Sequence, residues 1–305
     1  MHHNTDTPHL FCLGLGYSAG FVADVASAHG WTISGTTRSP EKAKVLEAKH
    51  EVTAHIMNIE AGRPLSADAG RGVSHMLVSI PARRDAHLLP DHSGPRAAEI
   101  SDFIKQYFPD LAWVGYLSTT GVYGDHQGSW VDETTPCQPL SERSKMRLAE
   151  EQAWQNACTD QGVGLDIFRL AGIYGPGKNA ITSLRRGKSR IINKPGQVFG
   201  RIHTADIAAA VYKAMAQSND GCRIFNLSDD LPATPQDVTQ FAASLTGLAM
   251  PSPVDIDDPS VSEMARSFYS ECKRTSSDKA KAELGLQLQY PTYKEGLIAL
   301  LKHGD

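Results

Sequence analysis

The stretch HLFCLGLGYSAGFVADVASAHG, residues 9–30, decides the fold of this chain. Residues 9–16 form a short apolar run that enters a glycine turn, which predicts a buried strand. Residues 18–29 then predict a helix that Gly30 closes. A strand, a glycine turn and a helix in this order are typical of the first unit of a parallel α/β sheet.

The turn carries Gly14 and Gly16, with the small residue Ala19 three positions later. In a G-x-G-x-x-G/A pattern the first glycine makes the tight turn, and the second lets a pyrophosphate approach the backbone. The small third residue allows close helix packing, and the phosphates face the helix N-terminus, here Tyr17 and Ser18. A plain βα turn is the competing interpretation, but the regular βα units that follow favour dinucleotide binding.

Further strands are indicated by short apolar runs that alternate with helical segments. The strands fall at 31–37, 52–57, 75–80, 112–118 and 165–170, and the helices at 41–49, near 95–107 and at 142–160. Ser39 and Pro40 are the N-cap and first-turn residues of the helix at 41–49. Because strands separated by helices pair in parallel, we predict a Rossmann-type doubly wound α/β sheet.

The pattern changes after Gly172. Residues 176–200 are rich in Gly, Arg and Lys and have no strong period, whereas 201–216 predict a loop leading into a helix and 223–228 one more strand. We therefore expect a dinucleotide-binding domain at 1–175, completed by 201–228. Residues 176–200 and 229–305 are expected to form a smaller C-terminal substrate lobe.

Composition and charge limit the class of protein. The chain has 305 residues, 41% hydrophobic and 21% charged, with a formal net charge of −4. This composition predicts a soluble globular protein, and the negative charge argues against a general nucleic-acid or membrane-surface binder. The five cysteines are scattered without C-x-x-C spacing, and no secretory pattern opens the chain. We therefore expect reduced thiols, no metal site and a cytoplasmic location.

The end of the second predicted strand indicates which dinucleotide is bound. An NAD-selective site usually has an acid about 20 residues after the glycine turn, which binds the ribose 2′-hydroxyl. Here the strand ends in Thr37 and Arg38, and the next acid is Glu41. A guanidinium can bind a 2′-phosphate through two hydrogen bonds and stack on adenine. We therefore predict NADP, with NAD as the alternative and Asn58 as an adenine contact.

Six segments, in order along the chain, carry a resemblance to a known family. They are YLSTTGVYGD (116–125), WVDETTP (130–136), FRLAGIYGPG (168–177), RIHTADIA (201–208), FNLSDD (225–230) and CKRTSSDKAKAELG (272–285). The chain thereby resembles the extended short-chain dehydrogenase/reductase family, also called the NAD-dependent epimerase/dehydratase family. The resemblance implies a Rossmann domain with a small C-terminal substrate lobe.

The resemblance also implies a catalytic set of a Ser or Thr, a Tyr and a Lys. Thr119 matches the first and Lys145 the last, whereas Ser141 stands where the family has its tyrosine. In that family the tyrosine exchanges a proton with the reacting oxygen, and the lysine binds the nicotinamide ribose and lowers the phenol pKa. A serine hydroxyl is shorter and far less acidic than a phenol. Tyr123, in GVYG, is our predicted substitute donor, with packing near the cofactor as its alternative role.

Other site residues follow from the same resemblance. Where the sugar-nucleotide dehydratases of the family place an Asp-Glu pair after the threonine, this chain has Thr120-Gly121, so that elimination chemistry lacks its acid and base. Around the nicotinamide we expect Ser79, Pro81, Lys145 and Gly172. The residues expected near the substrate are Thr120, Arg201, His203 and Arg274, with Arg83 and Arg84 either binding an anion or lying in solvent. His203 either acts as an acid or base or anchors the chain before the following helix.

Two functions are compatible with these residues. The first is an NADP-dependent oxidoreductase or epimerase-like enzyme that acts on a small polar or carbohydrate-derived substrate. The second, motivated by Ser141, is a protein that binds the cofactor without turnover and senses its redox state for a partner. We expect a small-molecule substrate, no nucleic acid and no membrane; a homodimer is compatible with the family.

Overall fold

The computed structural model of the chain describes residues 7–82, 87–90, 96–217 and 220–305. Arg83 and Arg84 lie outside the described residues. The chain divides into two compact units, which are described separately below. Unit 1 comprises Met1–Ser118, Met146–Phe168 and Ala208–Ile224, and unit 2 comprises Thr119–Lys145, Arg169–Ile207 and Phe225–Asp305. The division into a cofactor domain and a substrate lobe stays a prediction.

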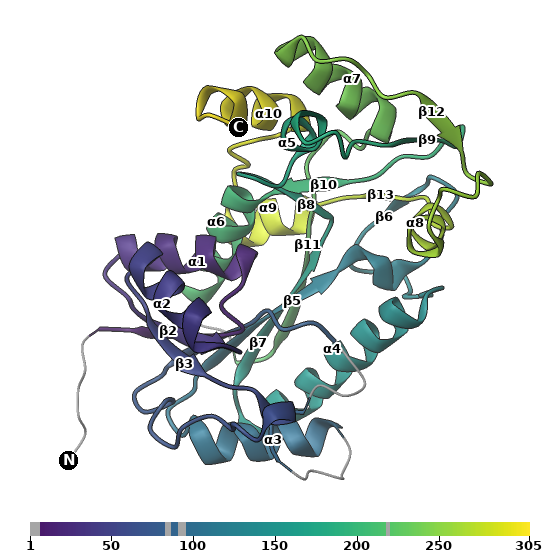
Figure 1. Cartoon of the computed structure of the whole chain (residues 1–305). Helices are drawn as coiled ribbons and strands as arrows, with labels where there is room; N and C mark the ends of the chain where they lie inside the picture. The colour runs from purple at the N-terminus through teal and green to yellow at the C-terminus, as the bar shows by residue number, and fades with distance from the viewer. Residues whose placement is uncertain (1–6, 83–86, 91–95, 218–219) are drawn as a thin grey trace. The chain divides into compact units, whose positions relative to one another are not determined.

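A seven-stranded sheet runs in the order β11-β7-β5-β4-β1-β2-β3 (Figure 1). Its strands are β1 (His9–Leu13), β2 (Thr32–Thr37), β3 (Thr53–Ile56), β4 (His75–Val78), β5 (Trp113–Thr119), β7 (Gly164–Leu170) and β11 (Cys222–Leu227). β1 pairs in parallel with β2 and with β4, β2 with β3, and β4 with β5. The predicted Rossmann-type doubly wound α/β fold is confirmed.

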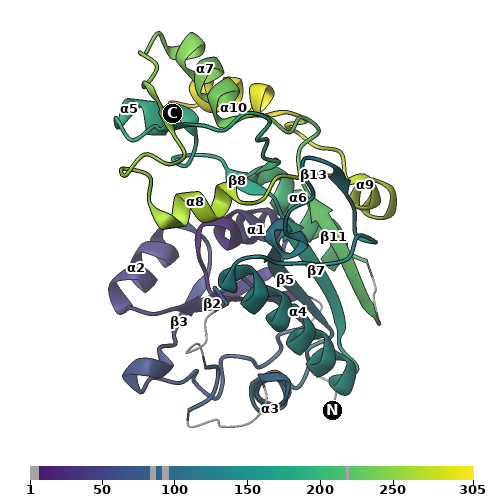
Figure 2. The ribbon, with the colours of Figure 1, turned by 90° about the vertical axis from the view of Figure 1, so that its right-hand side faces the viewer.

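Helices connect these strands. They are α1 (Tyr17–Ala28), α2 (Pro40–Lys49), α3 (Arg96–Tyr107), α4 (Glu142–Gln161) and α6 (Thr204–Met215), with a short 3-10 helix η1 (Ile59–Ala61). As predicted, Ser39 caps α2 by accepting a hydrogen bond from the Lys42 amide, and Pro40 stands in the first turn. In unit 1, α1 and α3 lie on opposite faces of the sheet (Figure 2).

The core of unit 1 packs the sheet against α3 and α4. Phe103 of α3 and Trp154 of α4 are completely buried, together with Phe11 of β1. The ring centroids of Phe11 and Phe108 lie 4.9 Å apart, and those of Phe103 and Phe108 lie 5.4 Å apart. Such tilted and edge-on contacts add specific geometry to the burial of apolar area.

Unit 2 combines short strands with helices. Its elements are η2 (Thr120–Tyr123), β6 (Trp130–Val131), β8 (Gly172–Tyr174), α5 (Ala180–Arg185), β9 (Ile191–Asn193), β10 (Arg201–His203), α7 (Pro235–Thr246), β12 (Pro253–Asp255), α8 (Glu263–Tyr269), β13 (Arg274–Thr275), α9 (Asp278–Leu284) and α10 (Tyr293–Lys302). Parallel pairs join β10 to β8, β12 to β9 and β13 to β6. The loop predicted at residues 201–203 is therefore wrong: they form β10, because a strand this short depends on a distant partner.

Among the described residues, no helix combines the length and the apolar character needed to cross a bilayer.

A buried carboxylate joins three strands of unit 1. Asp166 of β7 is fully buried and accepts a hydrogen bond from Trp113 Nε1 at 2.8 Å. It also accepts two from the guanidinium of Arg223, from Nε and Nη2, each at 2.7 Å. Trp113 begins β5 and Arg223 lies in β11, so the sheet depends on this carboxylate for its polar interior contacts.

We predict that Asp166→Ala destabilises the protein by about 3–5 kcal/mol, because it leaves the Arg223 charge without its buried partner. Urea unfolding followed by circular dichroism measures this change. Asp230→Ala is the control, since Asp230 forms an exposed ion pair with Lys281 and its loss should cost less than about 1 kcal/mol. Equal losses in the two variants would contradict the role given to Asp166.

Candidate functional site

The turn after β1 is built on the backbone of Gly14. Its φ of +92° lies in the left-handed region that favours glycine. A Cβ at this position would lie 2.7 Å from Ile80 Cγ2. The Gly14 amide donates to Thr36 Oγ1 at 2.8 Å, and its carbonyl accepts from the Ser79 hydroxyl. These contacts hold the turn between the end of β2 and the residue after β4.

The N-terminus of α1 follows directly. Gly16 is its N-cap, no side chain caps it, and the first turn contains no acidic residue. The amides of Tyr17, Ser18 and Ala19 belong to this first turn, where N–H groups point out of the helix. An N-terminus of this kind favours an anion such as a diphosphate, through its amides and the helix dipole.

A cavity of about 510 Å³ in unit 1 includes this turn in its wall. Seven of the residues predicted to contact a cofactor line it, namely Gly14, Gly16, Thr37, Arg38, Asn58, Ser79 and Pro81. Tyr17, Ser18 and Ala19 stand next to Gly16 but are not part of the lining, and Lys145 and Gly172 belong to unit 2. The structure therefore gathers the unit 1 candidates around one space.

The lining also contains residues that were not predicted. Lys42 lies in the first turn of α2, four positions after Arg38, and this spacing of two cations could have indicated it. Glu60, on η1, and His87 line the cavity as well. Two cations at the end of β2 favour a phosphate there, whereas Glu60 supplies an acid that suits a ribose hydroxyl.

One buried hydroxyl in the wall has no partner. Among the described residues, Thr37 Oγ1 is buried without a hydrogen bond, although Thr37 lines the cavity. Buried polar atoms are normally satisfied, so an orphaned one beside a cavity is a typical place for a ligand or an ordered water. The glycine turn, the helix N-terminus, the two cations and this hydroxyl together fit a dinucleotide.

Arg147 of α4 lies behind one lining residue of this cavity without lining the cavity itself. Its Nη1 donates to the Tyr116 hydroxyl at 2.9 Å and to the Leu117 carbonyl at 3.2 Å. It also reaches the carbonyl of Ile80, a lining residue, at 3.5 Å. No sequence motif pointed to Arg147, because its place depends on the packing of α4.

In unit 2, three hydroxyls gather around Gly121. Thr119 Oγ1 accepts from the Gly121 amide at 3.1 Å. Ser141 Oγ accepts from the Ser144 amide at 3.1 Å and donates to Ser144 Oγ at 2.9 Å. A Cβ on Gly121 would lie 2.9 Å from Ser144 Oγ and 3.4 Å from Thr119 Oγ1. Thr119 and Ser144 therefore both lie close to Gly121, and the predicted Ser141 is hydrogen-bonded to Ser144, which was not predicted.

Lys145 makes its ion pair on the surface of unit 2. Its Nζ lies 2.9 Å from Glu142 Oε1, and the two side chains are 54% and 65% exposed. An exposed pair of this kind contributes little to stability and breaks readily. Lys145 is therefore available for a ligand, at the cost of a weak ion pair.

Tyr123 is fully buried in unit 2. Its hydroxyl donates to Asn226 Oδ1 at 2.8 Å and accepts from Arg169 Nη1 at 3.1 Å. Burial raises the pKa of Tyr123 to about 12, against the opposing effect of the Arg169 charge. The burial and the two hydrogen bonds are those expected of a residue that packs in the interior. The role of Tyr123 as a proton donor stays a prediction.

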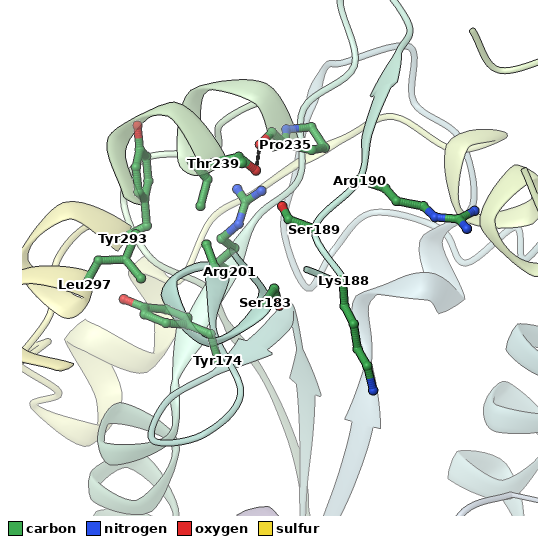
Figure 3. Close-up of a pocket in the computed structure, with 12 residues that line it drawn as sticks. Tyr174, Ser183, Lys188, Ser189, Arg190, Arg201, Pro235, Thr239, Tyr293 and Leu297 are labelled. Atoms are coloured by element: carbon green, nitrogen blue, oxygen red, sulfur yellow. Dashed lines mark hydrogen bonds between the residues drawn. The ribbon is translucent and has the colours of Figure 1, made fainter. Parts of the chain in front are cut away.

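The other predicted unit 2 residues lie in separate surroundings. Thr120 begins η2, and Gly172 begins β8, where its amide donates to the Gly200 carbonyl at 3.0 Å. Arg274 of β13 donates through Nη1 to the carbonyl of Gly128. Arg201 lies in a second cavity, of about 270 Å³ (Figure 3).

His203 is buried beneath aromatic rings. Its Nδ1 accepts from the Ala205 amide at 3.1 Å at the start of α6, and its ring contacts those of Tyr174 and Tyr290. Burial lowers the pKa of His203 to about 4, so the ring is neutral at pH 7. This environment supports the anchoring alternative over acid–base chemistry.

Two buried carboxyls flank β10. Asp206 accepts hydrogen bonds from the amides of Gln289 and Tyr290, and burial raises its pKa to about 6. Burial raises the pKa of Asp229 to about 7, against the lowering effect of the Arg201 charge. Among the described residues, Asp229 Oδ2 is buried without a hydrogen bond. No group of three or more His, Cys, Asp or Glu residues in the described part of the chain could hold a metal ion.

Comparison with a family model extends over most of the chain. The model described as the NAD dependent epimerase/dehydratase family matches residues 16–228. This range begins at Gly16, the last glycine of the turn, and includes Arg38, the hydroxyls around Gly121 and both β8 and β10.

Three similar proteins cover nearly the full length. A solved structure of a functionally unknown conserved protein from Silicibacter pomeroyi is 41% identical, with a TM-score of 0.85, over 97% of this chain and 99% of that one. Protein YeeZ of Escherichia coli K12 is 26% identical over 92% of this chain and 95% of its own. MoeE5, solved with UDP-glucuronic acid and NAD, is 18% identical with a TM-score of 0.75, over 97% and 98% of the two chains. That last likeness supports the fold alone.

We predict that the contribution of Asp229 to the stability of the protein falls between about pH 4 and pH 7. Its pKa rises from an ordinary 3.8 to about 7 on folding, so the native state holds a proton that the unfolded chain releases. This contribution is complete below pH 4 and is lost as the pH rises through 7. Asp229→Asn should remove it, so the free energy of unfolding of the wild type should fall relative to the variant across this range.

Urea unfolding at pH 5, 6, 7 and 8 measures both proteins. Asp257→Asn, which removes the same charge from a carboxyl that is 97% exposed and paired with Arg266, is the control and should follow the wild-type profile. Parallel profiles for wild type and Asp229→Asn would show that Asp229 does not titrate in this window.

Proposed function

The chain belongs to the NAD-dependent epimerase/dehydratase family, and on that basis we propose that its unit 1 cavity binds NADP. We further propose that it is an oxidoreductase or epimerase-like enzyme for a small polar or carbohydrate-derived substrate. The observation that carries the cofactor proposal is the pair of cations, Arg38 and Lys42, in the wall of a cavity that also holds the glycine turn. A 2′-phosphate needs this positive charge, whereas a 2′-hydroxyl does not.

In this proposal each part of the cofactor has its own contacts. The amides at Gly16 and the start of α1 bind the diphosphate, and the bare backbone of Gly14 lets it approach. Arg38 and Lys42 bind the 2′-phosphate, and Asn58 contacts the adenine. Ser79 and Pro81 stand at the nicotinamide end. Bound NADP supplies a hydride acceptor, or a donor when reduced.

The proton is the difficult part of the proposed chemistry. Thr119 would bind the reacting oxygen, and Lys145 would leave Glu142 to contact the ribose. Ser141 cannot act as the family's tyrosine does, because an aliphatic hydroxyl is a poor acid. In this structure the Ser141 hydroxyl is also hydrogen-bonded to the amide and the hydroxyl of Ser144. Tyr123 would have to give up its bonds to Asn226 and Arg169. A water molecule is therefore our preferred proton source.

A second function rests on the same serine. If no group passes the proton, the protein binds NADP or NADPH without turnover and reports their ratio to a partner. Ser141 as an N-terminal cap of α4 and the surface ion pair of Lys145 favour this alternative. We favour the enzyme, since positioned proton transfer contributes about 10²–10⁴-fold and its loss leaves hydride transfer feasible.

We predict that Arg38→Ala weakens NADPH binding by at least about tenfold and leaves NADH binding nearly unchanged. The reason is the loss of a charge-assisted contact, worth about 1.5–3 kcal/mol, to the 2′-phosphate. Titration calorimetry with both nucleotides measures the affinities. Arg71→Ala is the matched control, because Arg71 is exposed and pairs with Asp68. Equal NADH and NADPH affinities in the wild type would refute the choice of NADP.

We predict that Ser141→Tyr consumes NADPH faster than Ser141→Phe, by about 10²–10⁴-fold, on a panel of small aldehydes and ketones. Both variants lose the serine cap, which costs about 1 kcal/mol, and only the tyrosine adds a phenol. Absorbance at the NADPH band gives the rates. If the two variants are equally slow while NADPH still binds, the missing phenol does not limit the reaction, and the sensor becomes the better account.

A further inference from the structure

A second cavity, of about 270 Å³, lies entirely within unit 2. Helices α5, α7 and α10 and the strand β10 contribute its walls (Figure 3). Its lining contains three basic residues, Lys188, Arg190 and Arg201, and no acidic one. In a chain whose formal net charge is −4, this is a locally positive space.

Arg201 is the basic side chain that lies inside this space. Figure 3 shows its guanidinium between α7 and Ser189. Nη1 donates to the carbonyls of Phe199, at 2.9 Å, and Ala233, at 3.0 Å. These two bonds use one nitrogen of the three. No ion pair of the guanidinium with a carboxylate is found within the described residues.

A largely desolvated guanidinium without an ion pair is unusual. Burial lowers the pKa of Arg201, and the charge of Asp229 is the first effect that opposes this. The Asp229 carboxylate accepts a hydrogen bond from the backbone amide of Arg201 at 3.4 Å, and the Asp229 amide donates to the Arg201 carbonyl, so these contacts involve the backbone of Arg201 and not its guanidinium. Buried charges are normally paired through direct contact, whereas the Arg201 guanidinium has the Asp229 charge nearby but no carboxylate hydrogen-bonded to it among the described residues.

The rest of the lining suits an organic body more than a bare ion. Tyr174, Tyr293, Val238 and Leu297 are buried and line the cavity. The Arg201 guanidinium carbon lies 6.0 Å from the centroid of the Tyr293 ring. Hydroxyls of Ser189 and Thr239 stand on the polar side. This combination offers one planar charged donor group, a few hydroxyls and an apolar wall.

We propose that this cavity binds a small organic carboxylate, with its carboxylate on the free edge of the Arg201 guanidinium and a short apolar or aromatic body against Tyr174, Val238 and Leu297. The planar fork of the guanidinium matches a carboxylate in two parallel hydrogen bonds. A phosphate dianion is the weaker fit, because a single guanidinium leaves its remaining oxygens to apolar walls. The site goes beyond the NADP proposal and does not depend on it, because every lining residue belongs to unit 2.

The other two cations of the lining provide a matched control. In Figure 3 the side chains of Lys188 and Arg190 point away from Arg201. Arg190 Nη1 donates to the Ser260 carbonyl at 2.8 Å. Arg190→Met therefore removes the same charge and the same side chain type as Arg201→Met, from the same lining, without touching the proposed contact.

A structural role for Arg201 must be separated from ligand binding. Its two carbonyl contacts hold Phe199 next to Ala233, whose backbones also form a β-bridge. Arg201→Met could lose binding simply by loosening that bridge. Ala180→Phe answers this, because it fills the cavity from α5 and leaves Arg201 and its backbone contacts in place.

The experiment is ligand-observed NMR titration of the full chain, without nucleotide, using benzoate, butyrate, benzamide and inorganic phosphate. We expect benzoate and butyrate to bind, and benzamide, which has the same shape as benzoate without the charge, to bind at least about tenfold more weakly. Arg201→Met and Ala180→Phe should each weaken benzoate binding by about tenfold or more, whereas the benzoate affinity of Arg190→Met should stay within about twofold of the wild-type value. Circular dichroism melts establish that each variant is folded.

Several results would overturn the proposal. The first is that benzamide binds as tightly as benzoate. The second is that the folded Ala180→Phe variant binds benzoate as tightly as the wild type. The third is that Arg201→Met and Arg190→Met lose the same amount of benzoate affinity. Phosphate binding more tightly than either carboxylate would replace the carboxylate by a phosphate ligand. NADPH calorimetry on the same Arg201→Met protein keeps the two proposals apart, because the unit 1 cavity should bind NADPH as in the wild type.

Discussion

The candidate cofactor site depends on the backbone of Gly14, which two hydroxyl groups hold, one at its amide and one at its carbonyl. The hydroxyl of Thr36, in β2, accepts a hydrogen bond from the Gly14 amide. The hydroxyl of Ser79, after β4, donates one to the Gly14 carbonyl. These are the two strands that flank β1, so one peptide fixes the point where the sheet's order changes direction. Ile80 lies so close that no side chain could be added. The turn, the N-terminus of α1 and the cavity wall all take their positions from this residue.

The serine that replaces the family's tyrosine has a structural task. The Ser141 hydroxyl accepts a hydrogen bond from the Ser144 amide at the start of α4. A tyrosine at this position could not cap the helix in this way, because its hydroxyl lies far from the backbone. The hydroxyls around Gly121 remain able to bind an oxygen, but none of them is a strong acid. In the proposed enzyme, proton transfer would therefore limit the reaction more than hydride transfer, and this is the physical basis for considering both an enzyme and a sensor.

Desolvation is the largest cause of the pKa shifts of four buried ionisable groups in unit 2. Burial lowers the pKa of Arg201 and His203 and raises the pKa of Asp206 and Asp229, so each of these groups is shifted toward its neutral form. The Asp206 carboxylate accepts hydrogen bonds from backbone amides, and so does Nδ1 of His203, whose Nε2 is buried without a partner among the described residues. Arg201 keeps an unmatched charge beside a cavity, which is why a negatively charged ligand is the natural complement.

The sequence by itself determined the parts that depend on local pattern. The alternation of apolar runs and helices predicted the parallel sheet, the glycines at 14 and 16 predicted the turn, and Ser39 predicted the start of α2, because each follows from spacing within a few residues. The tertiary structure alone decided the rest. It turned Arg147 toward Ile80, brought Ser144 close to Gly121, and made residues 201–203 a strand. Each of these depends on partners far away in the chain, and sequence spacing carries no information about which distant residues will meet.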